Sequence, residues 1–374
     1  MLQNTKIGIA VSEFKFKTMN RIKLVFTCDN KFYPGLAGTI TSLLLCSSSM
    51  EIDMYVIDGG ISEKNKQDLE RTITFISKEV TIAFIKPNLT SLSSFPAFFG
   101  SMMTYVRLLI PSLIQEKKVI YIDTDILFTK DIVELWAVPL NGKTAAAIVD
   151  PSVAQMHMDC SICAELGIEP TAPYFNAGLL VLDLESEQKK DVMKRALSYL
   201  TEHPEQCTYH DQSALNAMLY NDVVFIDPSW NTLSRKISYT ATTDYVKLLG
   251  DINYHFVSPY KPWLYYSESL PDRIFRCLLD TIGCTYQNGA FAKTKVQFIR
   301  RKYFSRIAPI FYTLKARVLF TISGRNPDTD LEIANYWKEL NGEREKLKSL
   351  ETQMDAVYES WNRKLLQVMN RKES

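Results

Sequence analysis

The chain has 374 residues, 46% of them hydrophobic and 23% charged, which is typical of folded globular proteins. This length suits one large domain with an appendage, or two domains. The net charge of +1 excludes a globally basic nucleic-acid-binding protein, although basic residues gather locally near the C-terminus. Residues 1–17 contain too short an apolar stretch for a signal peptide, and no window reaches the ~18 apolar residues of a membrane span. We therefore expect a cytoplasmic protein.

The seven cysteines are scattered and odd in number, which favours reduced thiols over a disulfide framework. Cys160 and Cys163 have a zinc-like spacing, but the sequence offers no second pair to complete four ligands. We expect them to be unpaired thiols.

From residue 22 the chain alternates short apolar runs with helical stretches. The apolar runs predict strands at 22–27, 53–57, 80–85, 119–122, 145–149 and 178–182. Helices are expected at 34–46, from an N-cap at Ser62 to about residue 78, at 104–110 before Pro111, and near 186–202 and 211–220. This alternation is typical of an α/β protein whose mostly parallel sheet is flanked by helices. Ligands of such sheets bind beyond the carboxyl ends of the strands, so site residues should directly follow strands.

The tripeptide Asp-Thr-Asp occurs twice. The copy at 328–330 follows a proline at the expected start of a helix, where carboxylates most simply cap backbone N–H groups. Asp123-Thr124-Asp125 instead follows the apolar run Val119–Ile122, so its carboxylates emerge where a strand ends. Residues two apart share one side of an extended chain, and paired carboxylates suit Mg²⁺ or Mn²⁺. The alternative for this pair is a solvated turn.

Other phosphate-binding motifs are missing. The sequence contains no G-x-G-x-x-G, and Gly142-Lys143-Thr144 lacks the first glycine of a P-loop. A bound diphosphate would therefore be held by a metal and basic side chains.

Five further segments fall in one order around the first Asp-Thr-Asp. They are LVFTCD at 24–29, TYVRLLIP at 104–111, FNAGLLVLDL at 175–184, HDQ at 210–212 and HFVSPYKPW at 255–263. Over roughly residues 22–265 the series closely resembles glycosyltransferase family 8, the retaining galactosyl- and glucosyltransferases that include bacterial lipooligosaccharide enzymes and glycogenin. The resemblance implies a GT-A-like fold, a mostly parallel sheet flanked by helices, with a helical C-terminal extension.

The resemblance also implies roles for individual residues. Asp123, Asp125 and His255 match the metal ligands, for Mn²⁺ or else Mg²⁺. Gln212 matches the residue beside the anomeric carbon, and Asp211 is the nearer carboxylate if a covalent intermediate forms. Positions that match the binding site of the UDP-hexose donor are Asp29, Lys31, Phe32, Arg107, Asp123, Thr124, Asn176, Ala177, Gly178, Ser258 and Lys261.

Three of these positions depart from the family. Ser258 stands where a glycine is usual, Phe32 replaces the commoner tyrosine, and Lys31 replaces a small polar residue. Purely structural alternatives also exist for single residues, since Arg107 would serve in a buried ion pair and a lone histidine is more often structural than a ligand.

Two C-terminal segments differ in composition from the rest. Residues 291–325 are basic, contain no acidic residue and interleave aromatic side chains, which indicates contact with an anionic membrane surface. The alternative is a basic groove that packs on the catalytic domain. Residues 331–370 carry a seven-residue apolar repeat from Ile333 to Val368, which predicts an oligomerising coiled coil. The alternative is a helix folded back on its own domain.

These features divide the chain into a tail at 1–21, a catalytic domain at 22–265, a basic region at 266–330 and a helix at 331–374. We expect a metal-dependent, retaining transferase that moves glucose or galactose from a UDP-sugar to a cell-surface glycan, for which a lipid-linked acceptor would suit the basic segment. Its location would be cytoplasmic, peripheral on the inner face of the plasma membrane, with no nucleic-acid partner. The alternatives are transfer to a protein acceptor and a non-catalytic sugar-nucleotide-binding scaffold.

Overall fold

The computed structural model describes residues 21–92, 95–97, 101–153, 166–233, 252–267, 269–286, 291–297 and 299, with positions 356, 359, 360, 363 and 367. Cys160, Cys163, the second Asp-Thr-Asp, most of the basic segment and the apolar repeat lie outside these residues. The described cysteines, at 28, 46, 207, 277 and 284, are not in disulfide bonds, as expected. Within the described ranges, no helix combines the length and hydrophobicity needed to cross a bilayer.

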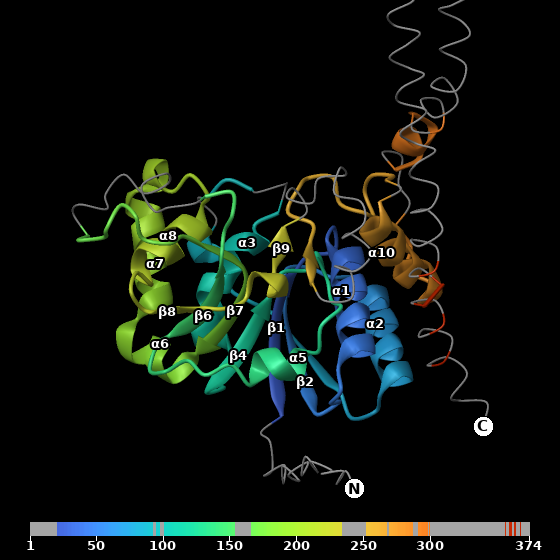
Figure 1. Ribbon diagram of the computed structural model, residues 1–374, viewed down its shortest axis with the longest axis horizontal. Coiled ribbons are helices and arrows are strands. Elements are labelled where there is room, and N and C mark those ends of the chain that lie inside the picture. The colour runs from blue at the N-terminus through green and yellow to red at the C-terminus, as the bar shows by residue number, and fades with distance from the viewer. Residues whose placement is uncertain are drawn as a thin grey trace, which may run out of the picture.

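A seven-stranded sheet with the order β3-β2-β1-β4-β7-β6-β8 forms the centre of the fold (Figure 1). Its strands are β1 Ile22–Cys28, β2 Ile52–Asp58, β3 Thr81–Ile85, β4 Lys118–Ile122, β6 Ala145–Val149, β7 Phe175–Asp183 and β8 Val223–Phe225. The β1–β2, β2–β3, β1–β4 and β6–β8 pairs are parallel, whereas β7 is antiparallel to β4 and β6. The mostly parallel sheet expected from the sequence is confirmed.

Helices cover both faces of this sheet, because successive strand residues point to opposite sides and both sides are apolar. Leu24 and Phe26 of β1 pack into one core, and Val25 between them packs into the other. The first core receives α1 Tyr33–Cys46, α2 Glu63–Ile76, α5 Ile132–Trp136 and α10 Leu270–Thr281. The second receives α3 Met103–Val106, α4 Ile110–Leu113, α6 Leu184–Lys190, α7 Val192–Glu202 and α8 Asp211–Met218. In Figure 1, α6, α7 and α8 lie to the left, and α1, α2 and α10 lie to the right.

Most predicted helix ends are confirmed, but two are wrong. Ser62 caps α2 by accepting a hydrogen bond from the backbone N–H of Asn65. Pro111 does not stop a helix: it lies in the first turn of α4, where a missing N–H costs no helical bond. The helix expected near 186–202 is divided into α6 and α7 at Asp191, whose φ of 51° is left-handed.

A second sheet, which the sequence analysis did not predict, has the order β5-β10-β9. Its strands are only two residues long: β5 Ile126–Leu127, β9 Thr232–Leu233 and β10 Tyr254–His255. β10 runs antiparallel to β5, which sets His255 opposite Ile126, and the N–H of Phe256 donates to the carbonyl of Asp125 at 2.9 Å. This small sheet therefore brings His255 beside the residues that follow β4.

Candidate active site

The predicted site residues meet at the edge of the main sheet where β1 and β4 end. Because β7 runs antiparallel to β4, its first residues lie at the same edge, and the N–H of Asp123 donates to the carbonyl of Gly178 at 2.8 Å. Asn176 and Ala177 were expected just before a strand that begins at Gly178; all three residues lie within β7, which begins at Phe175. The predicted site residues therefore lie just after the parallel strands β1 and β4, or near the start of the antiparallel strand β7.

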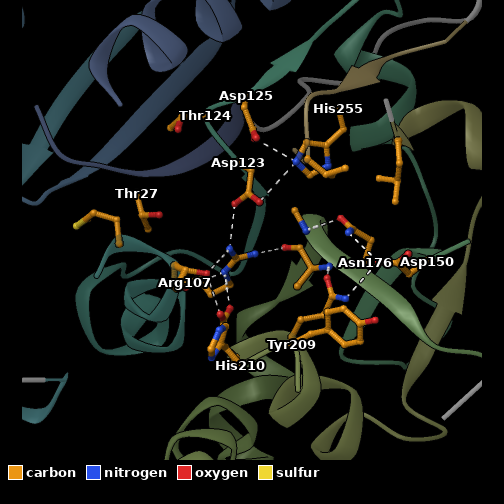
Figure 2. Close-up of a pocket in the computed structure, with 18 of the residues that line it drawn as sticks. Thr27, Arg107, Asp123, Thr124, Asp125, Asp150, Asn176, Tyr209, His210 and His255 are labelled. Atoms are coloured by element: carbon orange, nitrogen blue, oxygen red, sulfur yellow. Dashed lines mark hydrogen bonds and ion pairs between the residues drawn. The ribbon is translucent and has the colours of Figure 1, made fainter. Parts of the chain in front are cut away.

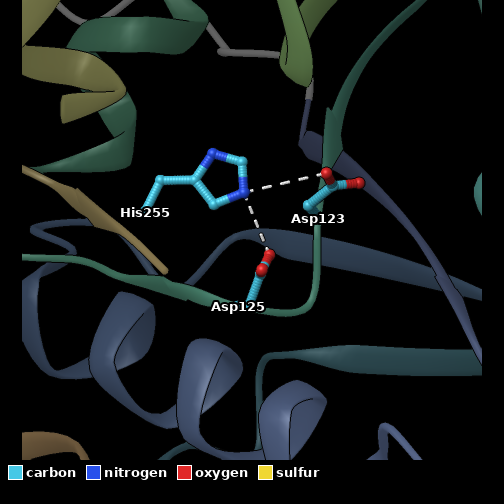
Figure 3. Close-up of side chains that lie close together, drawn as sticks. All are labelled: Asp123, Asp125 and His255. Carbon is cyan, nitrogen blue, oxygen red and sulfur yellow. Dashed lines mark hydrogen bonds and ion pairs between the residues drawn. The ribbon is translucent and has the colours of Figure 1, made fainter. Parts of the chain in front are cut away.

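Asp123, Asp125 and His255 form a compact cluster, each offering a ligand atom within 4.8 Å of the others (Figure 3). His255 Nε2 lies 3.1 Å from Asp125 Oδ1 and 3.8 Å from Asp123 Oδ2. Gly178 is needed for this approach, since a Cβ there would lie 2.4 Å from His255 Cε1 and 2.8 Å from Asp123 Oδ2. Two carboxylates and one imidazole fit Mn²⁺, which accepts both oxygen and nitrogen ligands.

Asp125 is buried and ion-paired. Lys261 Nζ donates to Asp125 Oδ2 and to the carbonyl of Phe256, each at 2.5 Å. Burial alone would raise the pKa of Asp125, but the charge of the Lys261 ammonium group holds it well below the usual range. The resemblance implies that Lys261 contacts the donor diphosphate, and in the structure its ammonium group lies beside the Asp125 carboxylate.

Arg107 joins Asp123 to Asp211 beneath the cluster. Its guanidinium is buried, with Nη2 3.1 Å from Asp123 Oδ1 and Nε 2.8 Å from Asp211 Oδ2, and it lies over the Tyr121 ring. Burial lowers the pKa of Arg107, but the surrounding anions more than offset it, so the group stays charged. Asp211 also accepts from Thr104 Oγ1 at 2.8 Å, and burial raises its pKa. The carboxylate of Asp211 is thus committed to Arg107 and Thr104.

A pocket of about 460 Å³ opens above these groups (Figure 2). Predicted site residues that line it are Phe32, Arg107, Asp123, Thr124, Asp125, Asn176, Ala177, Gly178, Asp211, Gln212, His255 and Lys261. Three predicted donor residues are absent from this lining: Asp29, Lys31 and Ser258.

The side chains of Asp29 and Ser258 make local contacts. Asp29 accepts at Oδ1 from the N–H groups of Lys31 and Phe32, and at Oδ2 from Ser101 Oγ at 2.5 Å. Ser101 itself lines the pocket, so Asp29 borders it through that residue. Ser258 Oγ accepts from the N–H of Tyr260.

Two residues of the site were missed by the sequence analysis. Asp150 directly follows β6, and its Oδ2 accepts from Gln212 Nε2 at 3.2 Å, while Gln212 Oε1 accepts from the N–H of Ala177 at 3.0 Å. The rule that site residues follow strands could have found Asp150. Asn231, whose Oδ1 lies 2.8 Å from His255 Nδ1, precedes a two-residue strand and carries no such signal.

Comparison with known proteins agrees with this geometry. The model of the family described as Glycosyl transferase family 8 matches residues 23–267. General stress protein A of Bacillus subtilis (strain 168) is 31% identical over 259 residues, which cover 64% of this chain and 86% of that protein. Lipopolysaccharide 1,2-glucosyltransferase of Escherichia coli (strain K12) is 22% identical over 300 residues, covering 77% of this chain and 87% of the relative.

A solved structure has the same fold. It is that of the galactosyltransferase LgtC in complex with donor and acceptor sugar analogs, which superposes with a TM-score of 0.58 at 23% identity. The match covers 72% of this chain and 98% of LgtC. The sheet and flanking helices described above are therefore those of a GT-A-like fold.

Proposed function

The chain belongs to glycosyltransferase family 8 and is a hexosyltransferase, and we propose that it transfers glucose or galactose from a UDP-sugar to a cell-surface glycan with the help of a bound metal. The observation that carries the proposal is the cluster of Asp123, Asp125 and His255 at the edge of a pocket large enough for a sugar nucleotide. The relatives support a hexose donor and a glycan acceptor, because one of them is named as a glucosyltransferase of lipopolysaccharide.

The three ligands would hold Mn²⁺, or else Mg²⁺, against the donor diphosphate. When bound, the metal would neutralise charge on the leaving diphosphate as a Lewis acid. Lys261 would add a second positive charge there, once it exchanges Asp125 for a phosphate oxygen. Arg107 holds Asp123 in place beneath this site. We place Phe32 against the uracil, with its ring edge-on to Trp263 at 6.5 Å between centroids.

Transfer would proceed with retention of anomeric configuration. The bond between the anomeric carbon and the β-phosphate oxygen breaks as the acceptor oxygen attacks the same face, and the leaving phosphate oxygen takes the acceptor proton. Positive charge develops at the anomeric carbon in such a transition state. Gln212 lines the pocket with its amide held by Ala177 and Asp150, so it would present a fixed dipole to that carbon. In this proposal Asp211 is not a nucleophile; it holds Arg107 in place through their ion pair.

Release of UDP tests the proposal directly. Purified protein would be incubated with UDP-glucose, UDP-galactose and other UDP-sugars, with Mn²⁺ or with chelator, and UDP would be measured. We expect release from one UDP-hexose in Mn²⁺ and little in chelator. A non-catalytic scaffold would release no UDP from any donor, and transfer to a protein acceptor would label a protein rather than a glycan.

The C-terminal segments remain proposals from the sequence. We propose that 22–265 is the catalytic domain, although the described part of 266–330 includes α10, which packs on α1 through Phe275 and Gly38. The basic segment at 291–325 would bind anionic membrane on the inner face of the plasma membrane. Sedimentation with liposomes that contain or lack anionic lipid tests this, and equal sedimentation contradicts it.

We also propose that residues 331–370 form an oligomerising coiled coil. Light scattering of the full chain tests this, and a monomer contradicts it.

A further inference from the structure

A line of hydrogen bonds links Asp150, in the lining of the pocket, to His255 of the proposed metal site. Asn176 Nδ2 lies 3.0 Å from Asp150 Oδ2, Asn231 Nδ2 lies 2.9 Å from Asn176 Oδ1, and Asn231 Oδ1 lies 2.8 Å from His255 Nδ1. All four side chains are buried, with exposed fractions of 4%, 7%, 2% and 3% from Asp150 to His255. Figure 2 shows the beginning and end of this line across the pocket. Buried polar groups are nearly always hydrogen-bonded, so each member of this line depends on its neighbours.

The direction of the hydrogen bond between Asn176 and Asp150 is fixed, because a carboxylate can only accept and a backbone N–H can only donate. A carboxylate only accepts, and Asp150 already accepts from Gln212 Nε2 and from the N–H of Ser152. At the other end of the amide, the N–H of Gly178 donates to Asn176 Oδ1 at 3.0 Å. The amide nitrogen of Asn176 must therefore face Asp150, and its oxygen must face Gly178 and Asn231.

The orientation of the Asn176 amide determines the orientation of the Asn231 amide and, through it, the position of the proton on His255. Because the oxygen of Asn176 accepts, Asn231 turns its amide nitrogen toward it and its own oxygen toward His255 Nδ1. A neutral imidazole carries one proton, so the ring donates from Nδ1 and keeps its lone pair on Nε2. Nε2 is the atom that faces Asp123 and Asp125.

The carboxylates by themselves would favour the opposite tautomer, in which Nε2–H donates to Asp125. With that tautomer, Nδ1 and Asn231 Oδ1 would face each other as two acceptors. The only way to avoid this is to rotate the side-chain amides of both Asn231 and Asn176 by 180°, which exchanges their oxygen and nitrogen atoms. Turning them over sets the oxygen of Asn176 against Asp150 and leaves the N–H of Gly178 without its acceptor. Each outcome buries an unsatisfied or repelled polar group.

We propose that Asn231 is a positioning residue that fixes His255 in the Nδ1–H tautomer, with Asp150 as the anchor of the line, and so presents the Nε2 lone pair to the metal. The proposal rests on the metal role proposed above. Asp150 holds Gln212 through the same oxygen, so one carboxylate orients both the pocket amide and the metal-binding ring.

Nitrogen NMR of the metal-free protein tests this. The chain has four histidines, so uniform ¹⁵N-histidine labelling gives few ring signals, and a His255→Gln variant identifies those of His255. Ring ¹⁵N shifts, followed over pH until the ring is neutral, distinguish the two tautomers. We expect Nδ1–H in the wild type and in Asn231→Asp, whose carboxylate still accepts from Nδ1. Asn231→Leu should shift the neutral ring to Nε2–H.

Calorimetric titration with Mn²⁺ gives a second readout. Loss of an outer-shell partner typically weakens metal affinity about 10- to 100-fold, and we expect this for Asn231→Leu but not for Asn231→Asp. Asn253→Leu is the matched control: Asn253 is equally buried and close in sequence to His255, but its Oδ1 accepts from the N–H groups of Thr129 and Lys130. That variant should keep the wild-type tautomer.

The outcomes separate this inference from the metal proposal. No Mn²⁺ binding by the wild type contradicts the metal role, whatever the tautomer. Mn²⁺ binding by the wild type, with Nε2–H in its neutral ring, contradicts the inference alone. So does a folded Asn231→Leu protein with unchanged tautomer and affinity. If Asn231→Leu does not fold, the tautomer of His255 in the wild-type protein still tests the inference.

Discussion

Substitution of Gly178 offers the most specific perturbation of the proposed metal site at Asp123, Asp125 and His255, because it changes neither the ligand side chains nor their charge. In Gly178→Ala the new methyl group would lie 2.4 Å from His255 Cε1 and 2.8 Å from Asp123 Oδ2. The first distance is roughly 1 Å short of ordinary van der Waals contact between carbons. Both neighbours are buried or ion-paired, so the His255 ring and the Asp123 carboxylate must separate.

The size of the effect follows from that displacement. Overpacking of this kind typically costs about 1–3 kcal/mol of folding free energy. A misplacement of about 1 Å in a catalytic arrangement lowers turnover by roughly 10²-fold. We therefore expect a folded protein with a lower melting temperature, weaker Mn²⁺ binding and about 10²-fold slower UDP release.

Gly38→Ala is the matched control. Its Cβ would lie 2.4 Å from Phe275 Cζ, an equally short contact, but at the junction of α1 and α10. The control should lose similar stability and keep its Mn²⁺ affinity, as calorimetry and thermal unfolding would show. Wild-type Mn²⁺ affinity and turnover in a folded Gly178→Ala protein would refute the reasoning.

Three further predictions concern single groups. Asp123→Asn should lower UDP release on the order of 10³-fold or more, since Lewis-acid stabilisation is worth several kcal/mol, and circular dichroism should stay unchanged; near-normal release would contradict the metal role. Gln212→Ala should lower kcat more than donor affinity, measured by steady-state kinetics beside calorimetry, and an equal loss in both would mark Gln212 as a pocket wall. Burial raises the pKa of Asp58, but the Lys66 ammonium at 2.7 Å and two backbone N–H groups hold it below its ordinary 3.8. The stabilisation, about 1–3 kcal/mol for a charge-assisted bond, should be present above that value and lost as pH falls through the lower folded pKa. Urea unfolding of wild type and Asp58→Asn should show their difference shrink below pH ~4, and a constant difference would contradict this pairing.

That Asp123, Asp125 and His255 lie together could be predicted from the sequence, because each of them belongs to a recognisable local motif. Asp123 and Asp125 follow a clear apolar strand, and the spacing of His255 to Lys261 matched a family pattern. The residues that organise the cluster left no comparable pattern. β5, β9 and β10 are two residues long, too short for any period to appear, and they exist because their partners bring them together.

Neighbouring chain segments also decided details that the local pattern could not. β7 begins at Phe175 because Phe175 and Asn176 pair with Val149 and Ile148 of β6, and this pairing places Asn176 inside a strand. Pro111 was expected to stop a helix, but a 3-10 turn at Arg107–Leu109 precedes it, and α4 begins at Ile110. Asp150 was predictable, since it follows β6 as Asp123 follows β4.

Calorimetric titration of the protein with its UDP-hexose, in Mn²⁺ and in chelator, tests the central claim most directly. If Asp123, Asp125 and His255 bind the metal that holds the donor diphosphate, the sugar nucleotide will bind far more weakly in chelator. Equal donor affinity in the two conditions would contradict the account.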